Sequence, residues 1–262
     1  MDLSYILADP SGNTTAFVLS PVEPARYGAV ARRVMDALSA EQVAFVHDGR
    51  MDMMGGEFCG NASRSFALWQ AYHAPDGRSL LPGAPRQETV AVSGAEHPLT
   101  VTLSAEPSGF FHAAIRMPLP RRVLPLAESP LGVCTLVEYP GISHLVLENA
   151  IPTDGDVSHA RALLTEHGAE DGCFGLLYLS GSTMRPLVYV RETDTLIWES
   201  SCASGTCAAA AARALAAGRS LELVLNQPGG SLSATAELQN GALTALLLDG
   251  PVTFPKSGVL TL

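Results

Sequence analysis

The sequence predicts an α/β protein of the α+β type with two pseudo-symmetric lobes, each a curved, mostly antiparallel sheet wrapped around a central helix. The order strand, strand, helix, strands, helix, strands occurs twice along the 262 residues. The second helix of each half begins at a cysteine, Cys59 or Cys202. The Ala208–Ala212 run has high helix propensity and almost no side-chain bulk, so strands can enclose such a helix closely.

The elements of the first half follow from hydrophobic periodicity. Tyr27, Val30, Val34 and Leu38 recur at helical spacing, and Pro24 suits a first helical turn. The expected elements are strands at Ser4–Ala8 and Thr15–Leu19, a helix over Pro24–Ala40, a strand at Val43–His47, a lead-in at Met51–Met54, the helix that Cys59 opens, and strands at Glu88–Val92, Leu99–Leu103 and Phe110–Met117.

The second half repeats this order with glycines just past both of its helices. Gly168 and Gly218 stand where glycine is favoured after a helix C-terminus. The expected elements are strands at Val133–Tyr139 and His144–Leu147, a helix over Ser158–His167, strands at Cys173–Leu179, Leu187–Glu192 and Thr195–Trp198, the Cys202 helix through Ala217, and strands at Leu221–Leu225, Leu232–Leu238 and Ala242–Leu248.

The Pro-rich stretch Met117–Pro125 is the expected crossover between the halves. Residues 1–117 then form an N-terminal lobe that carries Cys59, and residues 118–252 form a C-terminal lobe that carries Cys202. Residues 253–262 are candidates to return to the first lobe.

Composition restricts the classes of partner. Hydrophobic residues make up 47% of the chain and charged residues 16%, which is typical of an ordered globular protein. A net charge of −10 argues against nucleic acid or an anionic membrane as a partner. No apolar run approaches the ~20 residues of a membrane span, and Met1–Asp9 does not resemble a signal peptide, so we expect a cytoplasmic protein.

Cysteine and lysine usage bears on cofactors. The five cysteines are odd in number, and no Cys-x-x-Cys or His-x-x-x-His spacing suggests a metal site. Lys256 is the only lysine and lies near the C-terminus, whereas a pyridoxal phosphate enzyme needs a lysine for its Schiff base. We therefore expect neither a metal nor an organic cofactor.

The two helix-opening cysteines carry the functional prediction. A helix N-terminus offers unpaired N–H groups and positive partial charge, which can lower a cysteine pKa from ~8.5 to about 3.5–7.5. Two such thiols facing one cleft would form an acid–base pair able to act on opposite faces of a small molecule. This chemistry is that of a cofactor-independent racemase or epimerase.

The sequence around both cysteines resembles the diaminopimelate epimerase family over most of the chain. Cys59-Gly60-Asn61-Ala62-Ser63-Arg64 is similar to that family's Cys-Gly-Asn-Gly-x-Arg segment, and Ser201-Cys202-Ala203-Ser204-Gly205 to its Ala-Cys-Gly-Ser/Thr-Gly segment. The resemblance implies that both cysteines are catalytic and that the substrate is a small amino acid. It also implies these substrate-binding residues: Asn13, Gln42, Asp52, Gly60, Asn61, His144, Glu192, Ala203, Ser204 and Gly205.

Departures from the family pattern point to a different side-chain pocket. The arginine that pairs the distal carboxylate in the family is Thr193 here, and Ile142 and Asp52 replace two of its asparagines. Within the superfamily, segments 53–62 and 192–202 look most like histidine racemases, some of which serve opine-type metallophore biosynthesis. Asp52 could then hold an imidazole N–H. Diaminopimelate epimerase stays the alternative, and a homodimer is a further expectation.

Other functions remain open on the sequence alone. An isomerase of unsaturated acids or a phenazine-pathway enzyme on this fold generally lacks one or both cysteines. A thiol hydrolase that uses His144 would leave the second cysteine unexplained. A redox-sensing or ligand-binding protein could instead join the two thiols in a reversible disulfide.

Overall fold

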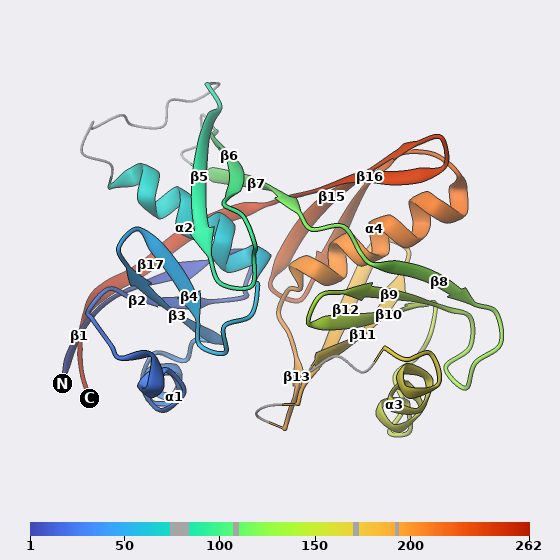
Figure 1. Cartoon of the computed structure of the whole chain (residues 1–262), viewed down its shortest axis with the longest axis horizontal. Coiled ribbons are helices and arrows are strands. Elements are labelled where there is room, and N and C mark those ends of the chain that lie inside the picture. Colours follow the sequence, from blue (N-terminus) through green and yellow to red (C-terminus); the bar gives the residue numbers. More distant parts are fainter. Residues whose placement is uncertain (74–83, 107–109, 170–172, 192–193) are drawn as a thin grey trace. The chain divides into compact units, whose positions relative to one another are not determined.

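Strands dominate both halves of the chain (Figure 1). Each half holds one helix that begins directly after a cysteine. The computed structural model describes residues 1–73, 84–106, 110–169, 173–191 and 194–262. The contacts divide the chain into unit 1, Met1–Arg116 with Asp249–Leu262, and unit 2, Met117–Leu248.

Unit 1 contains two helices among short strands. Its elements are β1 (Asp2–Asp9), β2 (Thr15–Val18), a 3₁₀ turn (Pro24–Arg26), α1 (Tyr27–Leu38), β3 (Gln42–His47), β4 (Arg50–Met53), α2 (Gly60–Tyr72), β5 (Arg86–Val92), β6 (Leu99–Ala105), β7 (Phe111–Met117) and β17 (Pro251–Thr261).

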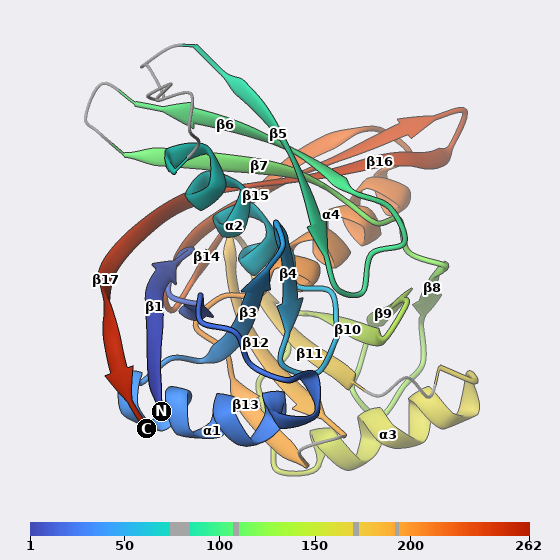
Figure 2. The ribbon, with the colours of Figure 1, turned by 60° about the vertical axis from the view of Figure 1, so that its left-hand side comes forward.

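The strand pairings of unit 1 run in a complete circuit. Each strand from β1 to β7 pairs with the next, β7 pairs with β17, and β17 returns to β1. All of these pairs are antiparallel except β2–β3 and β4–β5. Helix α2 contacts β1, β5 and β6, whereas α1 contacts β2 and β3. Figure 2 shows the two termini side by side where β17 runs along β1.

Unit 2 also places one helix against many strands. Its elements are β8 (Arg122–Leu126), β9 (Cys134–Tyr139), β10 (Ile142–Glu148), α3 (Asp156–Glu166), β11 (Cys173–Ser180), β12 (Thr183–Val190), β13 (Thr195–Trp198), α4 (Ala203–Ala217), β14 (Leu221–Gln227), β15 (Gly230–Gln239) and β16 (Ala242–Asp249).

Helix α4 is the buried centre of unit 2. It contacts β8, β9, β10, β11, β14 and β15, and its Ala208–Ala211 run is fully buried. Alanine keeps the helix thin, so strands approach it on several sides at van der Waals distance. The helix ends at Gly218, whose φ of +64° is the left-handed conformation that glycine adopts without strain. The predicted fold class is therefore confirmed in each unit.

Several local predictions differ from the structure, among them the lead-in, the crossover and the first helix. The segment expected as a lead-in is strand β4, which pairs with β3. Part of the expected crossover Met117–Pro125 is strand β8, which pairs with β9 and includes Pro125. The helix expected from Pro24 begins at Tyr27 after a 3₁₀ turn and ends at Leu38, before Ser39 with its φ of +54°.

None of the helices in the described parts of the chain combines the length and the hydrophobicity that a membrane span requires.

Candidate active site

Cys59 caps the N-terminus of α2 in unit 1. Its backbone is extended (φ −128°), and its Sγ accepts a hydrogen bond from the Ala62 N–H at 3.4 Å. The Ser63 hydroxyl donates to the Cys59 carbonyl at 2.7 Å. This capping arrangement fixes the sulfur over the positive end of the helix, where the backbone N–H groups of the first turn are available.

Amide side chains surround the Cys59 sulfur. Gln42 Nε2, at the start of β3, lies 3.3 Å from Cys59 Sγ, 2.9 Å from Asn13 Oδ1 and 2.8 Å from Thr15 Oγ1. Asn61 Nδ2 donates to the same Asn13 oxygen at 3.1 Å. The structure thus brings together Asn13, Gln42, Cys59 and Asn61, as the sequence predicts.

Arg64 completes this cluster from one turn further along α2. Its Nε donates to Asn61 Oδ1 at 3.1 Å, and its side chain is fully buried. The sequence motif contained Arg64, but no role followed from the motif, because only the fold shows that α2 turns this side chain inward.

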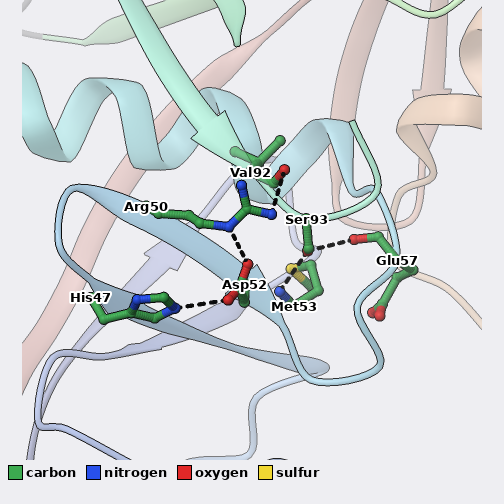
Figure 3. A network of polar contacts seen from close by, with 7 residues as sticks. All are labelled: His47, Arg50, Asp52, Met53, Glu57, Val92 and Ser93. Carbon is green, nitrogen blue, oxygen red and sulfur yellow. Dashed lines mark hydrogen bonds and ion pairs between the residues drawn. The ribbon is translucent and has the colours of Figure 1, made fainter. Parts of the chain in front are cut away.

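The loop that delivers Cys59 is fastened to the end of β5 (Figure 3). The Ser93 hydroxyl accepts from the Met53 N–H at 2.8 Å and donates to the Glu57 carbonyl at 2.8 Å, so it holds both ends of the loop. Gly94 has a φ of +70°, and a Cβ there would lie 2.2 Å from the Phe58 nitrogen. Only glycine allows this close approach beside the cysteine.

Asp52 lies apart from this cluster. It is opposite Phe45 in the β3–β4 pair, and Phe45 stacks on Tyr27 of α1 with ring centroids 3.8 Å apart. Side chains alternate between the faces of a strand, so Asp52 points to the α1 side while Met53 is buried on the other.

Figure 3 shows the partners that Asp52 already has. Its carboxylate bonds His47 Nε2 at 2.7 Å and Arg50 Nε at 2.8 Å. Burial alone would raise the pKa of Asp52, but these bonds and charges outweigh it and lower that pKa. The prediction that Asp52 holds a substrate imidazole thus has no support in the geometry of unit 1.

Cys202 caps α4 in unit 2 with nearly the same backbone geometry (φ −125°). Its N–H donates to Gln227 Oε1 at 2.8 Å, and Gln227 Nε2 donates to Thr206 Oγ1 at 3.0 Å. The Thr206 hydroxyl returns to the Cys202 carbonyl at 2.7 Å. Gln227 could not be predicted from the sequence, because nothing in the β14 pattern marks its side chain as one that reaches back to the helix start.

Burial, more than the helix N-terminus, controls the pKa of the Cys202 thiol. Burial raises its pKa well above the usual value, and the Glu199 charge adds to this. The Gly205 N–H and the Ser204 hydroxyl act in the opposite direction. The expectation of a lowered pKa at a helix N-terminus is therefore wrong for Cys202, since desolvation outweighs the helix end.

His144 joins the Cys202 cluster through Ser204. Its Nε2 lies 2.8 Å from Ser204 Oγ, which is itself 3.7 Å from Cys202 Sγ. Burial lowers the pKa of His144 to about 3, so the imidazole is neutral. With hydrogen on Nε2, the ring donates to Ser204 and leaves the hydroxyl hydrogen free to point at the sulfur. A Cβ at Gly175 would lie 2.4 Å from His144 Nδ1, so glycine is required behind the ring.

The remaining predicted residues fall beside these clusters or outside the described structure. Gly60 is buried in the first turn of α2, and Ala203, Ser204 and Gly205 form the first turn of α4. A Cβ at Gly205 would come within 2.7 Å of Leu177 Cδ2. Glu192 and Thr193 lie outside the described residues.

Comparison with known proteins identifies relatives over nearly the whole chain. The family model described as histidine racemase CntK N-terminal domain matches residues 2–260. A histidine racemase of Fusobacterium nucleatum subsp. nucleatum is 31% identical over 216 residues, 79% of each chain. A histidine racemase of Staphylococcus aureus is 25% identical over 270 aligned residues, which cover 95% of this chain and 94% of the relative.

Solved structures extend the similarity of fold. A Bacillus anthracis protein of the PhzF phenazine biosynthesis family superposes with a TM-score of 0.67 over 100% of both chains at 11% identity. At that identity the likeness concerns the fold alone.

Proposed function

The chain belongs to the histidine racemase family, and we propose that it inverts the Cα of histidine without a cofactor, with Cys59 and Cys202 as the two acid–base groups. The observation that carries the proposal is the repeated cap: in each unit a cysteine stands at the N-terminus of an enclosed helix. Two such groups on opposite faces of Cα would allow one to remove the α-proton and the other to return a proton with inversion.

The proposed reaction is two proton transfers at one carbon. A thiolate removes the α-proton of one enantiomer, the electron pair stays as a carbanion delocalised onto the α-carboxylate, and the opposing thiol protonates Cα from the other face. The sulfur that was a thiol becomes the thiolate, so the next turnover starts from the other enantiomer. The two cysteines thus exchange roles.

Backbone N–H groups would stabilise the carbanion. Gly60 and Asn61 open α2, and Ser204 and Gly205 open α4, so each helix presents donors beside its cysteine. A helix N-terminus binds a carboxylate and stabilises charge as it grows on the carboxylate oxygens. The neutral His144 would orient the Ser204 hydroxyl beside Cys202 and would not itself act as the acid of the reaction.

The test is exchange of the α-proton in D₂O, followed by NMR across a panel with L-histidine and LL-diaminopimelate under reducing conditions. We expect deuterium incorporation and D-histidine with histidine alone. Exchange with diaminopimelate only would assign the alternative epimerase activity. No α-proton exchange with any amino acid of the panel would contradict an amino-acid racemase.

Cysteine variants test the two-base mechanism in the same assay. Cys59→Ser and Cys202→Ser should each slow racemisation by at least about a hundredfold, since each removes one acid–base group. Cys207→Ala is the matched control, a fully buried cysteine of α4 with no proposed part in the chemistry. Turnover near the wild-type rate in either serine variant would refute the mechanism.

Use of the product in opine-type metallophore biosynthesis, a homodimeric state and a cytoplasmic location stay predictions from the sequence.

A further inference from the structure

Arg64 is a buried cation whose hydrogen bonds all go to uncharged oxygens. Its side chain has 0% exposure. Nη1 donates to the Gly250 carbonyl at 2.7 Å and to the Pro251 carbonyl at 3.0 Å, and Nε donates to Asn61 Oδ1. Nη2 has no hydrogen-bond partner among the described residues. None of the printed hydrogen bonds from this positive charge, within the described residues, goes to a carboxylate, although the charge of Asp249 acts on it.

This arrangement is costly to the fold. Burial lowers the pKa of Arg64 to about 10, which still leaves the guanidinium protonated at neutral pH. A buried charge without a paired counter-ion destabilises a protein strongly, and an apolar side chain of similar volume would often be neutral or better. A charge kept in such a position suggests a use for its electric field.

The field of Arg64 reaches the Cys59 sulfur. Burial lowers the pKa of Arg64, whereas the negative charges of Asp249, Cys59 and Asp9, in that order, raise it. Because the interaction is reciprocal, the guanidinium favours the anionic form of Cys59.

Hydrogen-bond donors act on Cys59 in the same direction. The Ala62 N–H and Gln42 Nε2 both point at Sγ, at 3.4 and 3.3 Å. Arg64 supports them at a distance: it bonds Asn61, which bonds Asn13, and the Asn13 oxygen also orients Gln42. Donors to the charged form of a group stabilise that form.

Several acidic groups also face this cluster. Asp9 lies at the end of β1, Asp249 at the end of β16, Glu41 directly before β3, and Glu57 in the loop before Cys59. Asn13 Nδ2 donates to Glu41 at 2.7 Å, and Glu57 accepts from the Gly55 N–H at 2.9 Å. These carboxylates oppose a thiolate, so the buried cation and the two donors must outweigh them.

We propose that Arg64 is a positioning residue that holds Cys59 as the resting thiolate of the free enzyme, while Cys202 rests as the thiol. The inference deepens the proposed function, since it requires Cys59 to be one of the two bases. In the resting enzyme Cys59 then removes the α-proton of the one enantiomer that presents its Cα–H to it, and Cys202 supplies a proton to the opposite face. The other enantiomer reacts from the exchanged protonation state. The burial of Cys202 and its neighbour Glu199 are consistent with the thiol form.

The test measures the thiolate of Cys59 without catalysis. In a Cys202→Ser background, the rate of iodoacetamide alkylation at Cys59 is followed against pH, with the site assigned by peptide mass spectrometry. Arg64→Lys and Arg64→Gln form a matched pair: both shorten the side chain and keep a donor, but only lysine keeps the charge. We expect Arg64→Gln to raise the alkylation midpoint by about one pH unit or more and Arg64→Lys to stay within about half a unit of the parent.

Equal midpoints for the parent and Arg64→Gln would overturn the proposal. Circular dichroism establishes that each variant is folded. If neither Arg64 variant folds, the Asp249→Asn variant is measured in their place. It removes a carboxylate whose negative charge counteracts the effect of Arg64 on Cys59, so the alkylation midpoint should fall. An unchanged or higher midpoint overturns the proposal. Alkylation does not depend on turnover, so a racemase assay that fails for every amino acid would reject the proposed function and leave this result standing.

Discussion

At the residue scale, the two cysteines share a cap geometry and differ in what surrounds the sulfur. Cys59 receives an amide donor and the field of a buried arginine, whereas Cys202 is enclosed near Glu199 and a serine–histidine pair. Two cysteines at the same position relative to a helix thus have thiols in different electrostatic surroundings, because a pKa depends on neighbours that are distant in the chain. A two-base racemase with one resting thiolate needs such a difference.

Because His144 is buried and neutral, the free energy of unfolding should fall at acid pH. Its pKa is about 3 in the folded protein, against an ordinary value of 6.5, because burial disfavours the imidazolium. The unfolded chain therefore binds one more proton below pH 6.5, and this stability is lost as pH falls from about 6.5 toward 3. We expect the free energy of unfolding from urea titrations to fall by about 1.4 kcal/mol per pH unit from this residue.

Two variants isolate that contribution. His144→Gln should remove this part of the pH slope, and His97→Gln, at an exposed position, should keep it. A difference in stability between the wild type and His144→Gln that stays constant from pH 6.5 to 4 would contradict a neutral buried histidine.

At the element scale, the position of Cys59 depends on a contact between the end of β5 and the loop before α2. Ser93 bonds both ends of that loop (Figure 3). Gly94 allows the two backbones to approach closely, because a Cβ there would lie 2.2 Å from the Phe58 nitrogen. Sequence periodicity predicted β5 up to Val92, but the pairing of a strand end with a loop about forty residues earlier has no local signal. Hydrophobic patterns report which face is buried, and they carry no information on which polar atoms meet.

Ser93→Ala should destabilise unit 1 and slow racemisation together. The Met53 N–H and the Glu57 carbonyl would each lose their partner, at a cost of about 1–3 kcal/mol for the buried donor. Urea unfolding measures the first effect, and the D₂O assay the second. Ser4→Ala, at an exposed position of β1, is the control that should change neither. Wild-type stability in Ser93→Ala would show that the loop is held by other contacts.

At the scale of the whole molecule, the C-terminal strand completes unit 1. Its pairing with β1 runs from Asp2 with Thr261 to Asp9 with Thr253, and the Gly250 and Pro251 carbonyls accept from Arg64. A strand from the far end of the chain thus closes the circuit around the helix that carries Cys59.

Removal of residues 251–262 should therefore open unit 1 and leave unit 2 folded. Hydrogen exchange should show lost protection in β1 and β2, while β11 and β12 keep theirs, because their pairing partners remain. A shorter deletion of Thr261 and Leu262 is the control and should affect only the last pairs. Full protection of β1 in the longer deletion would mean that the circuit does not need β17.

The sequence by itself determined the repeated element order, the fold class and the two helix-opening cysteines, because hydrophobic period, helix breakers and small-residue runs are local signals. Through the resemblance it also predicted Asn13, Gln42, Asn61 and His144 as substrate-binding residues, and the structure places them beside the two cysteine clusters. Only the tertiary structure decided that Arg64 points inward as an unpaired cation, that Gln227 and Ser93 fasten the two helix starts, and that Asp52 faces α1. These facts depend on which distant backbone segment lies opposite each side chain. Electrostatic interactions also act through space, so no local sequence pattern predicts them.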